Sequence, residues 1–137
     1  MGTGEYRQQK LRECRALLEG FWPEAFSFSR PRPLKLGIFE ELVADAARRG
    51  LPFDAAVLKA AIKAYVCRYA YQRAMSTHSA RIGLDGQPAG KVSPEQREYS
   101  RLQIQRIDAK AKEKEKKRKR AAEAAKAAKP SASQSGA

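Results

Sequence analysis

The chain has 137 residues, enough for one domain and a terminal extension, and 42% of them are apolar. Its formal net charge is +13, from 28 Lys and Arg against 15 Asp and Glu, which favours binding to a polyanion, either a nucleic acid or an anionic membrane surface. No apolar run is long enough to span a bilayer, and the N-terminus lacks the basic-then-apolar order of a signal peptide, so we expect a soluble, cytoplasmic protein.

Side chains that carry catalysis or bind metals are scarce. His78 is the only histidine and lies in a polar connector, which is poor material for acid–base chemistry or a metal site. Cys14 and Cys67 follow helical patterns beside apolar residues, which predicts buried free thiols. The sequence contains no nucleophile elbow, Walker loop, HExxH motif or paired carboxylates. We therefore expect neither an enzyme nor a bound metal or other cofactor.

Two helices are predicted in the first part of the chain. Residues 5–21 and 38–49 both place apolar side chains at helical spacing. Between them, the segment SFSRPRPLKLG contains two prolines and a glycine, which exclude a regular helix. Gly50 is expected to end the second helix, because glycine adopts the left-handed conformation common at helix C-termini.

A longer helix is predicted from Asp54, as the N-cap, to about Ala74. Its expected core stripe consists of Leu58, Ala61, Ile62, Tyr65, Val66 and Tyr69. At about 100° per residue, three cations fall together beside that stripe, namely Lys59, Lys63 and Arg73. This spacing fits a phosphate-binding ridge, and it fits a solvated helix face equally well.

Tyr71 projects away from the predicted stripe on a straight helix, so we expect an exposed aromatic ring among cations. An aromatic surface for stacking, next to cations for phosphates, is typical of RNA-binding faces.

A hairpin and a second capped helix follow. The stretch RIGLDGQPAG, residues 81–90, predicts a β-hairpin, with a turn rich in Gly, Asp and Pro. In VSPEQ, Ser93 is the predicted N-cap, Pro94 the first helical residue and Gln96 the third, which completes a capping box. This helix is expected to be anchored to the domain by Tyr99, Leu102 and Ile107.

The C-terminal part is expected to be an extension. Residues 109–129 hold ten Lys or Arg against three Glu, a net charge of +7. Their Ala, Lys and Glu content favours a helix, while the run KKRKR repels itself. We therefore predict a domain over residues 1–108 and, over residues 109–137, a basic helical or disordered extension that ends in a disordered PSASQSGA tail.

Three segments resemble the ProQ/FinO family of bacterial RNA chaperones in order and spacing. They are PRPLKLGIFEELV, LKAAIKAYVCRYAY and RIGLDGQPAGKVSPEQ, and the resemblance covers roughly residues 10–108. It implies a mainly α domain with one small β-hairpin and a positively charged concave face. It also implies binding to small regulatory RNAs and messenger 3′ ends, at a stem such as a terminator hairpin followed by a single-stranded 3′ tail. Strand exchange, RNA pairing and protection of RNA ends in post-transcriptional regulation would follow.

Carried over by position, the resemblance implies a binding face that includes Lys35, Lys59, Lys63, Tyr71 and Arg81. The exposed N–H groups at the Ser93 helix start can hold a phosphate beside Arg81. The sequence alone favours SPEQ as merely the cap of its own helix, and only the resemblance favours the phosphate contact. Arg73, Arg97 and Arg101 would extend the cationic area, giving the full set of candidate RNA-binding residues Lys35, Lys59, Lys63, Tyr71, Arg73, Arg81, Ser93, Arg97 and Arg101.

The chain departs from the family pattern at a few positions. Gly83 stands where an Asp is usual in the hairpin motif, and Ala70 stands where some members carry a basic residue. The chain also ends soon after its basic extension, so we expect a minimal, single-domain member of the family. We also expect a monomer with RNA as its partner and no membrane or small-molecule partner.

Other functions fit the same composition. A ribosome-associated protein, or a nucleoid-type protein that binds nucleic acid non-specifically, would share the charge and the Ala/Lys-rich extension. A protein-binding adaptor that uses the Glu-bearing helix 38–49 is a more distant alternative.

Overall fold

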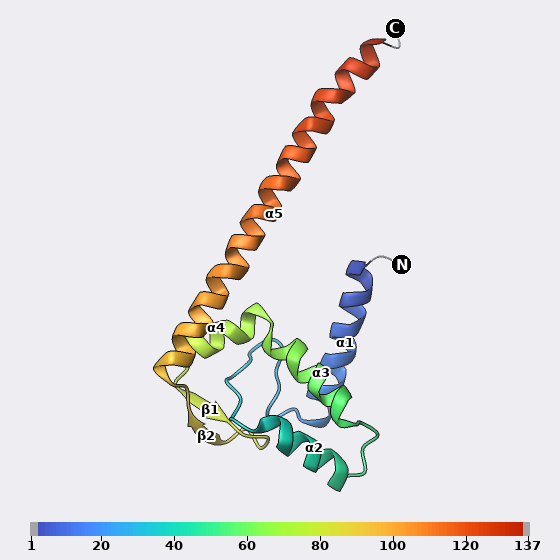
Figure 1. Cartoon of the computed structure of the whole chain (residues 1–137). Coiled ribbons are helices and arrows are strands. Elements are labelled where there is room, and N and C mark those ends of the chain that lie inside the picture. Colours follow the sequence, from blue (N-terminus) through green and yellow to red (C-terminus); the bar gives the residue numbers. More distant parts are fainter. Residues whose placement is uncertain (1–2, 136–137) are drawn as a thin grey trace. The chain divides into compact units, whose positions relative to one another are not determined.

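The computed structural model describes the backbone of residues 3–135 and is mainly helical, with one small hairpin, as predicted (Figure 1). Its elements are α1 (Thr3–Phe21), α2 (Ile38–Arg48), α3 (Ala55–Val66), α4 (Tyr69–Thr77), β1 (Ala80–Ile82), β2 (Pro88–Lys91) and α5 (Pro94–Ser135). Within this described part of the chain, none of the helices combines the length and the apolar character needed to cross a membrane.

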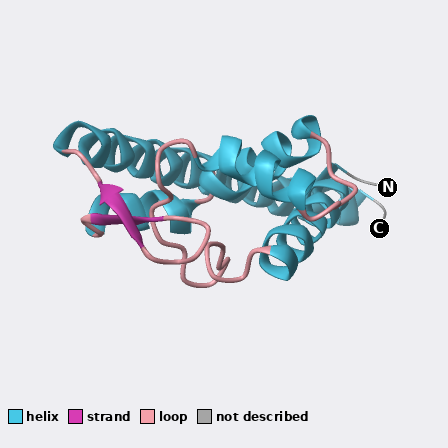
Figure 2. Ribbon diagram, turned by 90° about the horizontal axis from the view of Figure 1, so that it is seen from below, coloured by secondary structure: helices cyan, strands magenta, loops and turns pink. Residues whose placement is uncertain are grey.

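The chain divides into two compact units, of which the first ends at Leu102 and the second begins at Gln103. In the first unit α1 and α2 both pack against α3, and α3 is followed by α4. The strands β1 and β2 pair antiparallel and form the two-stranded sheet seen among the helices in Figure 2. The second unit is the continuation of α5. The expected boundary after residue 108 falls within this helix and stays a prediction.

Aromatic side chains form the centre of the first unit's core. Tyr65 is fully buried, and its ring centroid lies 5.0 Å from that of Phe26, 5.0 Å from that of Phe28 and 5.6 Å from that of Tyr71. The Tyr65 hydroxyl accepts a hydrogen bond from the Ser27 N–H and donates one to the Ser27 carbonyl. Each large buried side chain contributes about 1.5–3 kcal/mol. Helix α3 is thus joined to the segment after α1.

Helix ends that the sequence predicted are confirmed. Asp54 accepts a hydrogen bond from the Val57 N–H at 2.9 Å, which caps α3. Gly50 has φ +67°, and the following Leu51 N–H donates to the Ala46 carbonyl at 2.9 Å, which closes the end of α2. These are local arrangements, in which the capping group lies within five residues of the backbone group it satisfies.

The predicted single helix from Asp54 to Ala74 is wrong, because the helix is interrupted between Val66 and Tyr69. Arg68 is extended there, with φ −73° and ψ 145°, and is the N-cap residue of α4. The Gln72 side-chain amide donates to the Val66 carbonyl at 2.8 Å, replacing a helical donor at the break.

The cause of the break lies in another part of the chain. Arg68 donates to the Phe28 carbonyl at 2.7 Å, and its guanidinium carbon lies 4.4 Å from the centroid of the Phe28 ring. A charge-assisted hydrogen bond and a cation–π contact together favour the extended Arg68 over one more helical turn. No glycine or proline marks the position, so the local sequence carries no sign of it.

Three further expectations are corrected. Cys67 is exposed at the α3–α4 break, while Cys14 is buried and its Sγ donates to the Ala61 carbonyl.

Tyr99 and Leu102 are 55% and 44% exposed, so they are not the expected anchors of α5. The buried residue in this turn is Ser100.

The expected disordered tail is helical as far as Ser135, and residues 136–137 lie outside the described residues. The Ala-rich turns that precede the tail have high helix propensity.

Asp45 on α2 carries a buried carboxylate that connects α2 to Trp22, the residue that follows α1. The Trp22 Nε1–H donates to Asp45 Oδ2 at 2.7 Å, and Arg48 and Arg49 both form ion pairs with the same side chain. The hydrogen bond from Trp22 and the two arginines hold the pKa of the Asp45 carboxyl below its usual value, although burial acts in the opposite direction.

This lowered pKa predicts acid sensitivity. An Asp is protonated near pH 3.9 in the unfolded chain and only at lower pH in the folded one, so Asp45 stabilises the fold above that range. The stability is lost as the pH falls through the folded pKa. In urea unfolding measured between pH 6 and pH 2, Asp45→Asn should flatten the fall in stability. Asp108→Asn, at an exposed position on α5, is the control and should leave the profile unchanged.

Candidate nucleic-acid interface

Residues 55–84 form the longest stretch of the first unit that contains no carboxylate. They contain five Lys or Arg and no Asp or Glu, and they make up α3, α4 and β1. The five are Lys59, Lys63, Arg68, Arg73 and Arg81. Their surroundings differ, because some face solvent and others are buried and bonded to the backbone.

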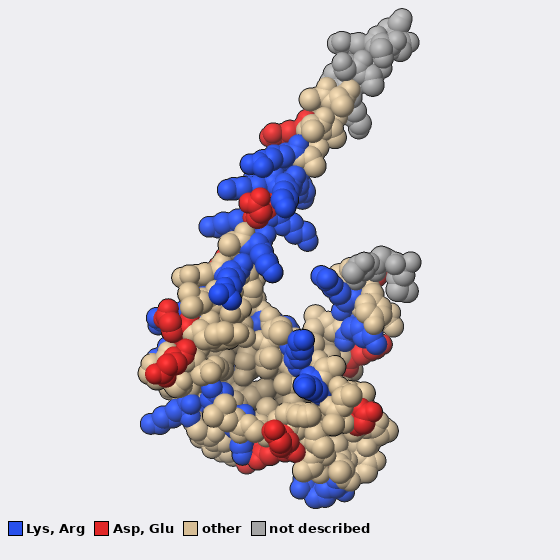
Figure 3. Space-filling view, in the orientation of Figure 1, with Lys and Arg blue, Asp and Glu red and all other residues tan. Residues whose placement is uncertain are grey.

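Lys59 and Lys63 are both exposed and lie one turn apart on α3. Neither forms an ion pair with any side chain in the described part of the chain. In Figure 3, blue side chains stand over α3 on a largely uncharged surface. Like charges at this spacing slightly destabilise a helix, so the stability of the fold does not explain why two lysines lie there. Two such free ammonium groups are suited to bind phosphates.

Arg73 is exposed as expected, but it does not share a helical face with Lys59 and Lys63. The break between α3 and α4 places it on a different helix. The predicted ridge of three cations is therefore a pair on α3 and a separate arginine on α4.

Tyr71 is buried, and the expectation of an exposed aromatic ring is wrong. Only 6% of its surface is exposed, and its hydroxyl accepts a hydrogen bond from the Leu34 N–H at 3.0 Å. Burial raises the pKa of the Tyr71 hydroxyl, while the hydrogen bond from Leu34 acts against this change. The turn of the chain at the helix break redirects the ring from solvent to the core.

Arg81 is also buried, although the resemblance placed it on the binding face beside a phosphate. Its Nη1 donates to the Leu34 carbonyl at 2.7 Å and its Nε to the Lys91 carbonyl at 3.2 Å. Next to it, the Ile82 N–H donates to the Pro33 carbonyl at 2.8 Å, and the Lys35 N–H donates to the Ile82 carbonyl at 2.8 Å. The segment 33–35 thus lies beside β1 as a short parallel bridge, which the two prolines in the sequence concealed.

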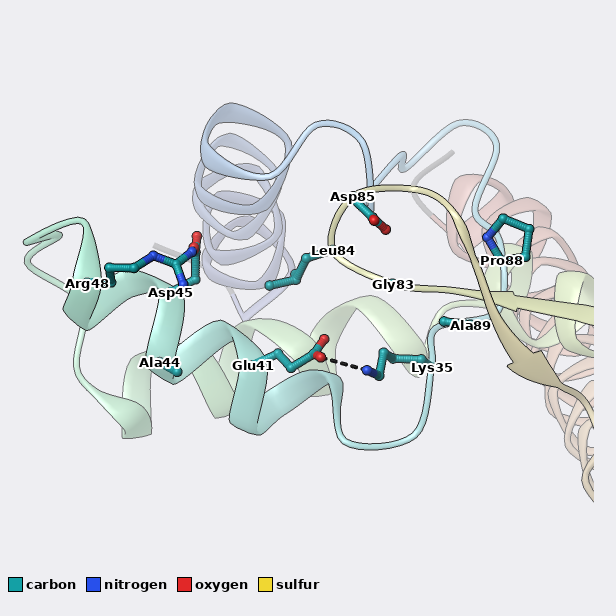
Figure 4. A pocket seen from close by; sticks show the side chains of 10 residues that line it. All are labelled: Lys35, Glu41, Ala44, Asp45, Arg48, Gly83, Leu84, Asp85, Pro88 and Ala89. Carbon is teal, nitrogen blue, oxygen red and sulfur yellow. Dashed lines mark hydrogen bonds and ion pairs between the residues drawn. The ribbon is translucent and has the colours of Figure 1, made fainter.

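Lys35 is half-buried and is not a free cation. Its Nζ lies 2.6 Å from Glu41 Oε1 on α2, as the dashed line in Figure 4 shows. Both side chains line a hollow between α2 and the hairpin tip, which also contains Asp45, Asp85 and Arg48. Acidic and basic groups are thus mixed in this hollow, and a phosphate there would have to compete with Glu41 for Lys35.

Gly83 lines the same hollow. A Cβ at this position would lie 3.3 Å from Asp85 Oδ1 and 3.7 Å from Lys35 Cδ. An Asp there would therefore add a carboxylate beside Lys35, close to that of Asp85. Its absence makes the hollow less acidic and leaves Glu41 as the partner of Lys35.

The start of α5 carries the remaining three candidates. The Gln96 N–H donates to Ser93 Oγ at 3.2 Å, which confirms Ser93 as the cap of this helix. Arg97 is half-buried, and its Nε has no hydrogen-bond partner among the described residues. Arg101 is exposed and lies 3.5 Å from Glu98, a solvent-exposed pair of little energetic value. Whether these side chains bind RNA stays a prediction.

Comparison with known proteins identifies relatives of this chain. Residues 8–129 match the ProQ/FINO family. A solved structure of a ProQ homolog from Legionella pneumophila is 31% identical, with a TM-score of 0.56 over 71% of this chain and 81% of that one. A FinO-like RNA chaperone from Neisseria meningitidis MC58 is 22% identical, with a TM-score of 0.57 over 73% of this chain and 80% of that one. Both likenesses agree with the helical fold and its hairpin.

The burial of Tyr71 predicts a structural role for its hydroxyl. In Tyr71→Phe the buried Leu34 N–H loses its acceptor, which should lower the free energy of unfolding by about 1–3 kcal/mol. Tyr69→Phe is the matched control, since Tyr69 is 39% exposed and its hydroxyl has no hydrogen bond within the described region. Urea unfolding of both variants is the measurement. Equal stability of the two would contradict the assignment.

Proposed function

Because the chain belongs to the ProQ/FinO family, we propose that it is an RNA-binding protein and RNA chaperone. The proposal extends to the kind of RNA: a stem followed by a single-stranded 3′ tail, as at terminator hairpins of small regulatory RNAs and messenger 3′ ends. Strand exchange, RNA pairing and protection of the bound end are the proposed consequences. The Neisseria relative is itself described as an RNA chaperone, which agrees with this activity.

One observation carries the proposal beyond family membership. Lys59 and Lys63 are exposed, unpaired within the described region, and belong to a stretch of residues 55–84 without any carboxylate. An RNA phosphate approaching α3 would gain two cations without displacing an internal partner. On α2, by contrast, Glu41 and Asp45 already engage the neighbouring Lys and Arg side chains.

The proposed mode of binding depends on shape and charge. An A-form stem offers closely spaced phosphates and a shallow minor groove, and its single-stranded tail offers free bases and ribose hydroxyls. Phosphate contacts position an RNA without identifying its sequence. We assign direct phosphate contacts to Lys59, Lys63 and Arg73, with Arg97 and Arg101 as further candidates.

Tyr71 and Arg81 act in this proposal by holding the segment 33–35, and with it the backbone that carries Lys35. The helix start at Ser93 provides backbone N–H groups near the hairpin, which suit a phosphate at the junction of stem and tail.

The basic part of α5 is proposed to add affinity without selectivity. Residues 109–128 are all exposed, so their cations are accessible to any polyanion. Contacts of this kind strengthen binding at low salt and speed encounter.

The preference for a tailed stem tests the proposed function. A hairpin with a single-stranded 3′ tail should bind more tightly than the blunt hairpin in gel-shift titrations. Lys63→Ala should weaken binding by about 1–3 kcal/mol if the ammonium group contacts a phosphate directly. Lys10→Ala is the control, since Lys10 lies on α1 and pairs with Glu13. Equal affinity for both RNAs would indicate a generic nucleic-acid-binding protein, such as the ribosome-associated or nucleoid-type alternative.

A second measurement separates α5 from the first unit. Replacing the five cations of residues 116–120 by Gln keeps good helix formers and removes five positive charges. The log–log salt dependence of affinity should become shallower by about 0.7–0.9 for each phosphate that α5 no longer neutralises. The preference for the tailed hairpin should persist. Its loss in this variant would show that α5, and not the first unit, recognises the RNA end.

A further inference from the structure

A surface hollow between the 27–32 segment and the end of α4 differs from the others in its charge. It has a volume of about 620 Å³ and is lined by Ser27, Arg30, Pro31, Arg32 and His78. Each of four other hollows in the described region includes at least one Asp or Glu in its lining. This hollow has two arginines, the chain's only histidine and no carboxylate.

Neither arginine of the hollow is paired with a carboxylate among the described residues. Arg32 donates to the Glu24 carbonyl at 3.0 Å and to the Gly86 carbonyl at 3.5 Å, both of which are neutral acceptors. Arg30 is exposed, and its backbone N–H donates to Ser27 Oγ at 3.1 Å. Neither guanidinium forms an ion pair with another described side chain. The segment therefore holds two uncompensated cations beside one hollow.

His78 gives the hollow a group that can change its charge. It follows the last residue of α4, and its Nδ1 lies 3.0 Å from the Ala74 carbonyl. A carbonyl oxygen can only accept, so Nδ1 carries the hydrogen in this contact. Nε2 is then the ring nitrogen left for a ligand. It is an acceptor in the neutral ring and a donor in the protonated one.

We propose that this hollow binds a phosphate of the RNA backbone, with Arg30, Arg32 and protonated His78 as its partners. The proposal rests on the RNA-binding function proposed above and adds a contact that depends on pH. A phosphate oxygen can only accept hydrogen bonds, so it gains a bond from Nε2 when the ring is protonated and meets a lone pair when it is neutral.

The surroundings of His78 set the direction of this pH dependence. The charged groups that line the hollow with it are Arg30 and Arg32, and α4 contributes only the neutral Ala74 carbonyl and Thr77 hydroxyl at the ring. A bound phosphate favours the protonated ring, so binding takes up a proton and affinity rises as the pH falls through the range in which histidines titrate.

The experiment measures the affinity of the full chain for a tailed RNA hairpin between pH 6 and pH 8 at constant ionic strength. The RNA carries hydroxyls at both ends, because a terminal phosphomonoester would itself titrate near pH 6. Binding should tighten at the acidic end, by at most about tenfold per pH unit for one proton taken up. His78→Asn should abolish this change, while its amide can still donate to the Ala74 carbonyl. His78→Lys should bind at pH 8 about as tightly as the parent binds at pH 6.

Two matched variants locate the contact. Arg30→Ala should weaken binding several-fold at pH 6, whereas Arg12→Ala, an exposed arginine on α1 outside the hollow, should not. Thermal melts of each variant separate binding effects from unfolding. A parent affinity independent of pH, or a His78→Asn variant that keeps the pH dependence, would overturn this site while leaving the proposed function standing. No binding by any variant at any pH would overturn both.

The source of the phosphate is distinguished by NMR. Because His78 is the only histidine, its ring signals can be followed without ambiguity. Addition of the RNA should shift these signals at concentrations near its Kd, and millimolar inorganic phosphate should leave them nearly unchanged. An equal response to inorganic phosphate at the RNA's concentration would assign the hollow to a free phosphate compound and overturn the proposed RNA contact.

Discussion

The first unit depends on how the backbone of Leu34 is satisfied. Leu34 is 3% exposed, so an unpaired N–H or carbonyl there would cost about 1–3 kcal/mol. Its N–H donates to the hydroxyl of Tyr71, and its carbonyl accepts from the guanidinium of Arg81. These partners lie 37 and 47 residues further along the chain. Helix α4 and strand β1 must therefore both approach the proline-containing segment, and this requirement fixes the position of the hairpin. The contact of Arg68 with Phe28 breaks the helix after α3.

The need to satisfy buried backbone groups also decides which cations of the first unit are available for binding. Arg81 and Arg68 are used inside, on backbone carbonyls, and Lys35 is neutralised by Glu41. Lys59 and Lys63 have no such partner in the described region and face solvent. A protein with a large positive charge thus exposes only some of its cations for binding. This arrangement supports binding of a phosphate backbone by the exposed lysines. The buried arginines stabilise the fold that positions those lysines.

Features set by neighbouring residues were predictable from the sequence. The caps at Asp54 and Ser93 and the end of α2 at Gly50 each need only a side chain or a flexible residue close to the backbone group concerned. The hairpin was marked by its turn, where Gly86 has φ +77° and a Cβ would lie 2.8 Å from the Glu24 carbonyl. The resemblance to the family came from motifs that include these local signals, which is why it located the fold correctly.

The sequence by itself determined the charge of the chain, its helical character, most helix ends and the family to which it belongs. Only the tertiary structure decided that α3 and α4 are separate, that Tyr71 and Arg81 are buried, and which lysines remain free. The physical reason is that these features depend on contacts between residues far apart in the sequence. Helix periodicity assumes a continuous helix, whereas the bond from Arg68 to the Phe28 carbonyl interrupts it from 40 residues away. A cation's availability likewise depends on the acceptors that the fold brings to it, and no pattern of neighbouring residues records them.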